Sequence, residues 1–185
     1  MLFLKRCPAR WAFLLEHPIR RRLLQPDRLI RSLRLQPGAR VLDVGTGAGV
    51  IAAAIANHLE RGELVLVDPQ YAMLTRAQRR VKQRAQMPVS LLSAVAENLP
   101  LKDSSVDFAL LVTVLGEVDD AHLTLEEMRR VLRRGGVLSI TEHLPDPDFR
   151  AASKVRALVT RYGFAERDFS GGRWSYTINF VKTDT

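Results

Sequence analysis

A chain of 185 residues, 46% of them hydrophobic, has the length and composition of one folded domain with a buried core. Its apolar runs are too short to span a bilayer, and the one cysteine, Cys7, excludes an internal disulfide and a cysteine-based zinc site. We therefore expect a cytoplasmic protein and a single domain over residues 1–185, with a basic helical cap or lid at 1–39 and an α/β core at 40–185.

The net charge of +8 belongs to the beginning of the chain. Residues 1–40 contain ten lysines and arginines against Glu16 and Asp27, which leaves 18 basic and 18 acidic residues for the rest. A charge run of this kind is usual for a solvated surface. It would equally suit peripheral contact with an anionic membrane surface or an acidic partner, and these interpretations stay open. Because the remainder is neutral and lacks an aromatic and basic stripe, nucleic acid is not expected as a partner.

In chain order, the first predicted elements are helices at 9–15 and 26–35. Pro26 suits the first turn of the second helix, and Pro37-Gly38 ends it. Short apolar runs then alternate with segments of helical period. Strands are predicted at 41–44, 64–67, 89–92, 106–112 and 137–141, and helices at 49–59, 70–86, 120–132 and 148–162. We expect the helix at 120–132 to stop at the glycine pair Gly135-Gly136.

The last segment has a different pattern. Residues 164–169 and 173–181 are predicted to be two strands joined by a tight turn at Ser170-Gly171-Gly172. Strands separated by helices imply right-handed βαβ units and a parallel sheet covered on both faces. The predicted fold class is therefore α/β: a Rossmann-like, doubly wound, mostly parallel seven-stranded sheet with an antiparallel C-terminal hairpin strand.

A glycine-rich loop follows the first of these strands in the core. Glycines allow unusual backbone angles and let a ligand approach the backbone, and the N–H groups of a helix start favour an oxygen-rich group. The segment lacks the Gly-Lys-Ser/Thr of a phosphate-binding loop, and Val50 stands where a dinucleotide fingerprint has its third glycine. Asp43, just before the glycines, would repel a pyrophosphate and favour an ammonium or a sulfonium. These features argue against a nicotinamide-dependent oxidoreductase.

The next strand ends at Asp68, at the distance where an acidic residue can bind the hydroxyls of a ribose. Since Pro69 follows and a helix begins there, Asp68 could also cap that helix. The two roles are compatible.

Four blocks of sequence carry a more specific signal: VLDVGTGAGV, LVLVDPQYAML, AENLPLKDSSVDFALLVTVLGEVDD and EEMRRVLRRGGVLSITEH. In these blocks and in their order, the chain resembles the class I S-adenosylmethionine-dependent methyltransferases, particularly the branch of ubiquinone/menaquinone-biosynthesis C-methyltransferases. The resemblance covers roughly residues 20 to 181. It implies S-adenosylmethionine as cofactor and S-adenosylhomocysteine as product.

The resemblance also implies the residues of the site. In this family, the glycines and Asp43 would hold the methionine part of the cofactor, Asp68 the ribose, and the backbone N–H of Ala96 the adenine. The cofactor-binding residues implied in this way are Asp43, Gly45, Thr46, Gly47, Gly49, Asp68, Pro69, Met73, Val95, Ala96, Glu97, Thr113 and Val114. Two positions depart from the family pattern, because Val95 replaces an aspartate that accepts a hydrogen bond from adenine, and Gly116 replaces a common histidine.

Methyl transfer is an in-line displacement, and it needs a general base only when the nucleophile must lose a proton. Candidate bases are His143, Glu117 and Asp119, and no metal is expected. We expect a small-molecule or lipid-like acceptor, with a quinone-like molecule or a phospholipid as sub-cases. The alternative is a non-catalytic S-adenosylmethionine-binding or regulatory module, in which Val95 and Gly116 mark lost chemistry.

Overall fold

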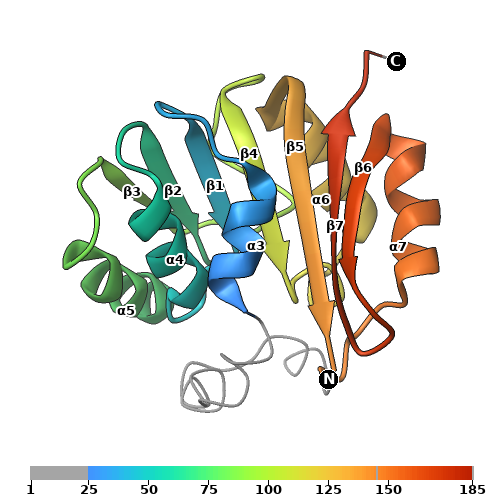
Figure 1. Cartoon of the computed structure of the whole chain (residues 1–185), viewed down its shortest axis with the longest axis horizontal. Coiled ribbons are helices and arrows are strands. Elements are labelled where there is room, and N and C mark those ends of the chain that lie inside the picture. Colours follow the sequence, from blue (N-terminus) through green and yellow to red (C-terminus); the bar gives the residue numbers. More distant parts are fainter. Residues whose placement is uncertain (1–24, 145, 185) are drawn as a thin grey trace.

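The computed structural model describes residues 25–144 and 146–184. One seven-stranded sheet, in the order β3-β2-β1-β4-β5-β7-β6, runs through the molecule (Figure 1). Its strands are β1 (Arg40–Val44), β2 (Glu63–Val67), β3 (Val89–Leu92), β4 (Val106–Val112), β5 (Leu132–His143), β6 (Phe164–Gly171) and β7 (Ser175–Lys182). The helices are α3 (Pro26–Leu33), α4 (Val50–His58), α5 (Tyr71–Lys82), α6 (Ala121–Val131), α7 (Ala152–Val159) and the short 3-10 helix η2 (Thr160–Tyr162).

The predicted fold class is confirmed. Strands β1 to β5 pair in parallel, and β7 pairs antiparallel with both β5 and β6. The strand order reverses between β1 and β4, because β2 and β3 extend from one side of β1 while β4 and β5 extend from the other. In open sheets of this kind, ligands bind beside the carboxyl ends of the strands at such a reversal point.

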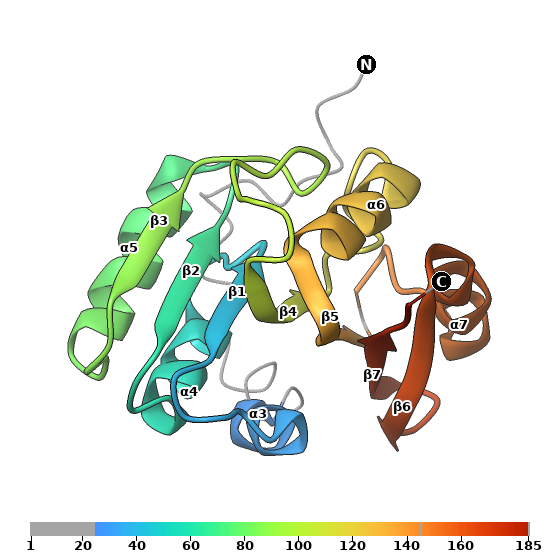
Figure 2. The ribbon, with the colours of Figure 1, turned by 90° about the horizontal axis from the view of Figure 1, so that it is seen from above.

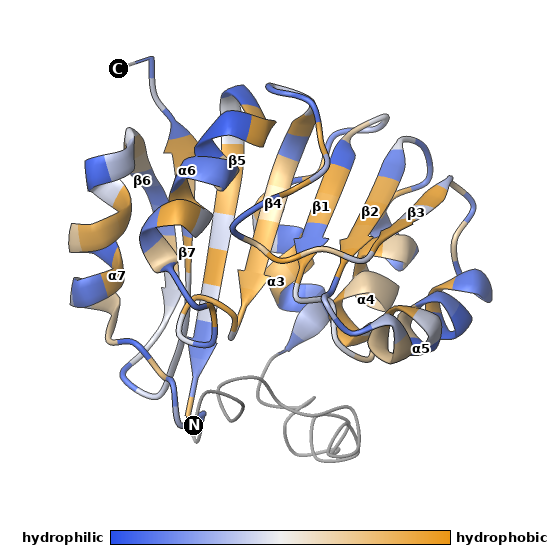
Figure 3. Cartoon of the chain, turned by 180° about the vertical axis from the view of Figure 1, so that it is seen from behind, coloured by the Kyte–Doolittle hydropathy of each residue, from blue (hydrophilic) through white to orange (hydrophobic). Residues whose placement is uncertain are grey.

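Helices cover both faces of the sheet. Helices α3, α4 and α5 lie on one face and α6 and α7 on the other (Figure 2). Strands that are buried on both faces need apolar side chains in both directions, and this explains the continuous apolar runs of the sequence. The hydrophobic residues concentrate on the strands and the hydrophilic ones on the outer sides of helices such as α5 (Figure 3).

One predicted boundary is wrong. Helix α6 ends at Val131, and β5 begins at Leu132 instead of after a stop at Gly135-Gly136. Leu132 pairs with Val106, but the next pair is Phe108 with Val137, so the glycines form part of an irregularity in β5. Gly135 has a φ of 69°, which a glycine adopts without strain. The pair therefore shapes this irregular stretch and does not end the helix.

The predicted helices within the described residues are all shorter in the structure, and α5 ends at Lys82 instead of at residue 86. Helix α3 ends at Leu33, and Arg34 after it has a left-handed backbone with a φ of 54°. Helix α7 starts only at Ala152, after a turn in which the N–H of Asp148 donates to the side chain of Asp146. The predicted helix at 9–15 lies outside the described residues. Within the described ranges, none of the helices has the length and apolar character that crossing a membrane requires.

Candidate functional site

A pocket lies at the carboxyl ends of β1, β2 and β4, at the reversal point of the sheet. The loops after these strands and after β3 supply its walls. The lining residues are Asp43, Val44, Gly45, Thr46, Gly47, Ala48, Val50, Ile51, Val67, Asp68, Pro69, Gln70, Met73, Ala94, Val95, Ala96, Glu97, Val112, Thr113, Val114, Glu117 and Val118. The structure thus brings together every cofactor-binding residue implied by the sequence except Gly49.

The glycine loop forms the floor between β1 and α4. Gly45 has a φ of +67°, and a Cβ built on it would lie 2.5 Å from Val114 Cγ2. Gly47 has a φ of +50°, and the nearest atom to a Cβ there is the Gly45 carbonyl oxygen at 3.9 Å. Gly45 therefore allows two loops to approach each other, whereas Gly47 leaves space on the side of the pocket.

Gly49 has a packing role in the structure. It is the N-cap of α4, with a φ of +79°. A Cβ at this position would lie 2.6 Å from the Cα of Ala77 in α5, which real Cβ atoms do not tolerate. This glycine allows α4 to pack closely on α5, and it does not line the pocket.

Asp43 is buried at the end of β1, with 2% of its surface exposed. The Thr46 hydroxyl donates to its Oδ2 at 2.7 Å. Burial raises the pKa of Asp43 to about 7, against the opposing effect of the Thr46 hydrogen bond and with a smaller contribution from the charge of Asp68. A cationic group of a ligand at this position would favour the ionised carboxylate.

Asp68 connects the end of β2 to the glycine loop. Its Oδ2 accepts from the N–H of Gly47 at 3.0 Å and its Oδ1 from the N–H of Gln70 at 2.8 Å. Gln70 is itself the N-cap residue of α5, so Asp68 supports the turn before the helix and does not occupy the cap position. Each carboxylate oxygen can accept a further hydrogen bond, and ligand binding is therefore compatible with this structural role.

The wall after β3 carries Val95, Ala96 and Glu97. Glu97 Oε1 accepts from the N–H of Asp119 at 2.8 Å and of Asp120 at 3.2 Å. The carboxylate thereby ties the loop after β3 to the loop that leads into α6. It has a backbone-binding role as well as a place in the pocket lining.

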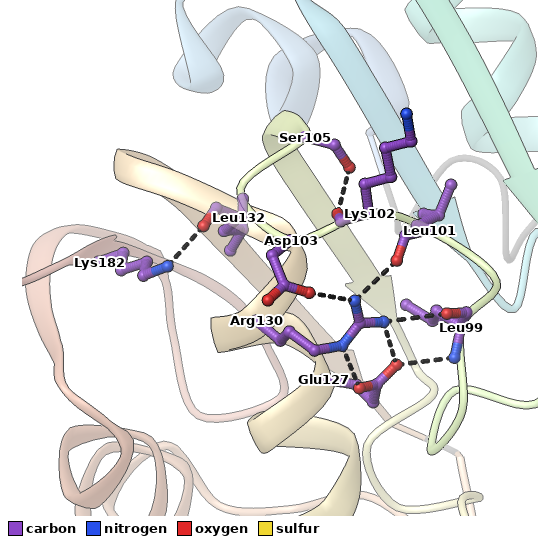
Figure 4. A network of polar contacts seen from close by, with 9 residues as sticks. All are labelled: Leu99, Leu101, Lys102, Asp103, Ser105, Glu127, Arg130, Leu132 and Lys182. Atoms are coloured by element: carbon purple, nitrogen blue, oxygen red, sulfur yellow. Dashed lines mark hydrogen bonds and ion pairs between the residues drawn. The ribbon is translucent and has the colours of Figure 1, made fainter.

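A polar network from α6 binds the backbone of Leu99 and Leu101, which follow this wall in the chain (Figure 4). Glu127 Oε2 accepts from the N–H of Leu99 at 2.7 Å, and Arg130 donates to the carbonyls of Leu99 at 2.9 Å and Leu101 at 2.7 Å. Arg130 also forms ion pairs with Glu127 and Asp103. Sequence reasoning missed this network. The one available signal was the Glu-x-x-Arg spacing on a helix, which places both side chains on one face.

The remaining wall follows β4. Thr113 has a φ of 56°, a strained conformation for a β-branched residue, and its N–H donates to Thr141 of β5 at 2.8 Å. Gly116, at the position where the family often has histidine, leaves no space for a side chain, because a Cβ would lie 2.1 Å from the carbonyl oxygen of Asp148. The loop after β5 thus packs directly on the loop after β4.

Of the three candidate bases, Glu117 alone lines the pocket. The N–H of Asp119 donates to Glu97, and Asp119 is not part of the lining. His143 is buried at the end of β5, with its Nδ1 2.9 Å from the carbonyl oxygen of Leu144, and it does not line the pocket either. Across residues 25–144 and 146–184, no group of three or more side chains has the arrangement of a metal site.

Comparison with known proteins assigns the family. A protein-family model described as a methyltransferase domain matches residues 42–140, which is more than half of the chain. The chain belongs to the class I S-adenosylmethionine-dependent methyltransferases. The cofactor of this family is S-adenosylmethionine, and S-adenosylhomocysteine is its product.

Two of its curated relatives are ubiquinone/menaquinone biosynthesis C-methyltransferases. The one from Syntrophotalea carbinolica is 35% identical over 113 residues, which is 61% of this chain and 47% of the relative. The one from Shewanella oneidensis is 34% identical over 127 residues, which is 68% of this chain and 50% of the relative. The chain therefore spans about half the length of these relatives.

A solved structure shares the fold along nearly the whole chain. It is a SAM-dependent methyltransferase from Aquifex aeolicus, with a TM-score of 0.86 at 22% identity, covering 96% of this chain and 100% of that protein.

Proposed function

We propose that this protein transfers a methyl group from S-adenosylmethionine to a small-molecule or lipid-like acceptor. The observation that carries the proposal is the meeting of Asp43, Asp68 and the glycine loop in one pocket at the reversal point of the sheet. Two carboxylates beside a glycine loop suit a ligand that has an ammonium, a sulfonium and a ribose, and they do not suit a pyrophosphate.

The pocket residues fit the parts of this cofactor. Asp43 is placed to favour the ammonium of the methionine part, and Asp68 retains acceptor capacity for the ribose hydroxyls. The open space at Gly47 admits the ligand against the backbone. Val95 offers no hydrogen bond to the adenine amino group, so we assign recognition of the base to the backbone of Ala96 and to shape.

The sulfonium supplies an activated methyl carbon, and the chain has to align the acceptor with it and exclude water. Thr113, Val114 and Val118 form the wall that would orient the acceptor. Glu117 lies on the same wall, and it is the group that we assign to receive a proton when the nucleophile must release one.

Calorimetric titration with S-adenosylmethionine and S-adenosylhomocysteine tests the cofactor assignment. Replacing Asp68 by alanine should weaken binding by about 1–3 kcal/mol, because it removes the acceptor for the ribose and for the glycine loop. Asp27→Ala, an exposed carboxylate on α3, is the matched control and should leave the affinity unchanged. Unchanged affinity in Asp68→Ala would contradict the assignment.

Turnover separates an enzyme from a binding module. The full chain is incubated with S-adenosylmethionine and with acceptors that include a quinol, an amine and a phospholipid, and formation of S-adenosylhomocysteine is measured. Tight cofactor binding without product on any acceptor would favour the non-catalytic alternative.

Co-sedimentation with vesicles of phosphatidylglycerol, compared with phosphatidylcholine, tests the accompanying proposal that the basic N-terminal residues contact an anionic membrane.

A further inference from the structure

The large hydrophobic side chains that remain exposed lie toward one edge of the sheet. Among the described residues they are Tyr71 at 74%, Trp174 at 65%, Leu123 at 47% and Phe169 at 41%. Tyr71 is the first residue of α5, after the carboxyl end of β2, and Leu123 lies in the first turn of α6, which follows β4. Phe169 and Trp174 flank the turn between β6 and β7, beside the end of β5. This edge of the sheet also contains the cofactor pocket.

The backbone of Trp174 is fixed although its side chain is exposed. The N–H of Leu144, after β5, donates to the carbonyl oxygen of Trp174 at 2.8 Å. The N–H of Gly172 donates to the carbonyl oxygen of Ser175 at 2.8 Å and closes the turn. Gly171 has a φ of +110°, and a Cβ there would lie 2.3 Å from the same oxygen, so this tight return requires glycine. A tryptophan that is fixed through its backbone and exposed to water can anchor the molecule to a surface outside the chain.

Both exposed aromatic residues of the hairpin are paired with an arginine. The guanidinium of Arg173 lies 5.4 Å from the centroid of the Trp174 ring, and that of Arg156 lies 4.6 Å from the centroid of the Phe169 ring. Arg156 also forms an ion pair with Glu166, whereas Arg173 is exposed at the turn. An exposed tryptophan beside an exposed arginine fits an anionic bilayer, because the ring suits the level of the headgroups and the guanidinium binds phosphate.

The exposed side chains are spread across this edge. Tyr71 follows β2 and Trp174 precedes β7, and four strand spacings separate these two strands in the sheet. At about 4.8 Å per spacing, the strands are on the order of 20 Å apart. Helices α5 and α6 lie on opposite faces of the sheet, so Tyr71, Leu123 and Trp174 define a plane across the edge. A bilayer contacts separated anchors in one plane, whereas a folded partner protein would need a continuous apolar patch.

The chain that precedes the described residues joins the fold at the same edge. Helix α3 begins at Pro26 on the side of the sheet where the arrows of β1, β4 and β5 end (Figure 1). Residues 1–24 contain six lysines and arginines against one acidic residue, Glu16. Carboxyls at this edge, including those of the pocket, oppose attraction to an anionic surface. The attraction therefore comes from Arg173 and from residues 1–24.

We propose that this edge of the fold is a docking surface for an anionic lipid bilayer, with Trp174, Tyr71 and Leu123 as its apolar anchors and Arg173 as a contact with lipid phosphate. The inference rests on the membrane contact in the proposed function and extends it from the N-terminal residues to the folded part of the chain. It does not depend on which acceptor is methylated. In this orientation the pocket faces the bilayer.

The two tryptophans of the chain, Trp11 and Trp174, allow a direct test. In Trp11→Phe, emission comes from Trp174, and it is measured while vesicles of phosphatidylglycerol with brominated acyl chains are added. We expect a shift to shorter wavelength and quenching by about half or more, because the bromine atoms quench a ring that enters the bilayer. Arg134→Trp, in a chain that also carries Trp11→Phe and Trp174→Phe, is the matched control. Arg134 is exposed near the start of β5, at the opposite edge, so vesicles should leave this emission unchanged.

Co-sedimentation of the full chain with vesicles of phosphatidylglycerol measures the contribution of each anchor. Trp174→Ala should weaken binding about tenfold or more, and Tyr71→Ala and Leu123→Ala about threefold each, because each removes apolar surface from the contact. Arg173→Ala should weaken binding about fivefold, whereas Arg134→Ala, which removes the same charge from the opposite edge, should change it less than about twofold.

The outcomes separate this inference from the proposed function. Vesicle binding that none of the anchor variants weakens, or Trp174 emission that vesicles leave unchanged, would overturn the inference and leave the N-terminal contact standing. The absence of any vesicle binding would overturn both. Self-association in sedimentation velocity without lipid, abolished by Trp174→Ala, would assign the surface to a second copy of the chain and would also overturn the inference.

Discussion

Gly49 and Gly47 lie two residues apart in one motif, but the structure gives them separable roles. At Gly49 an added Cβ would meet the Cα of Ala77 at 2.6 Å, whereas at Gly47 it would meet nothing closer than 3.9 Å. We therefore expect Gly49→Ala to destabilise the fold and Gly47→Ala to impair cofactor binding. Gly135→Ala provides a matched reference, because Gly135 has a φ of +69° and no atom within 4 Å of a Cβ.

The magnitudes follow from two terms. Forcing alanine into the left-handed region costs about 1–2 kcal/mol, and a less flexible unfolded chain offsets about 0.5 kcal/mol of this. Gly135→Ala should thus lower the free energy of unfolding by about 1 kcal/mol. Gly49→Ala adds the displacement of α5, which costs about 1–3 kcal/mol more.

Urea unfolding followed by circular dichroism measures these differences, and calorimetry with S-adenosylmethionine measures binding. Gly47→Ala should resemble Gly135→Ala in stability and bind the cofactor about tenfold more weakly or worse, since a methyl group enters the pocket. Equal losses of stability in Gly49→Ala and Gly135→Ala would refute the reasoning about α4 and α5. Normal binding by Gly47→Ala would refute the reasoning about the pocket.

Three further predictions concern the rest of the site. Because the pKa of Asp43 is raised to about 7, the folded protein holds a proton that the unfolded chain releases, so stability should fall as the pH rises from about 4 to 7. About two of these pH units lie between pH 5 and 8, so Asp43→Asn should reduce the loss of stability between these two pH values, measured by urea unfolding, by at most about 3 kcal/mol. Arg130→Ala should cost about 2–4 kcal/mol by thermal unfolding, since two carbonyls and two carboxylates lose their donor, whereas Arg133→Ala, at an exposed ion pair, should cost less than about 1 kcal/mol. Val95→Asp should strengthen cofactor binding by about 1 kcal/mol in calorimetry, and no change would mean that another group holds the adenine amino group.

The fold was predictable because its strands are buried on both faces and therefore apolar throughout. The local sequence pattern does not predict the secondary structure where tertiary contacts determine it, as at Leu132. Helical spacing continues through this residue, but it is completely buried beside β4, and the Lys182 ammonium donates to its carbonyl at 2.6 Å. A contact between residues 50 positions apart is not visible in a local window.

The site, like the fold, has residues that the sequence predicts and residues that it does not. Motif residues such as Asp43 and Asp68 could be placed in one pocket from the sequence, since strand ends meet at one edge of a parallel sheet. The apolar lining residues, for example Val112 and Ile51, could not, because nothing in their spacing distinguishes them from the core. The burial of Glu142 Oε1 without a hydrogen-bond partner among the described residues is likewise a property of the packed structure alone.

The position of β7 has a consequence for biosynthesis. Translation produces β6 before β7, yet β7 lies between β5 and β6, so β6 has no neighbour in the sheet until β7 is made. Phe180 of β7 is fully buried in the finished molecule, so the core lacks this side chain until β7 has been made. A nascent chain that lacks β7 exposes the edge of β5, which is a template for pairing with other chains. We expect closure of the sheet to wait for β7, and a chaperone that shields the edge of β5 until then should raise the yield of folded protein.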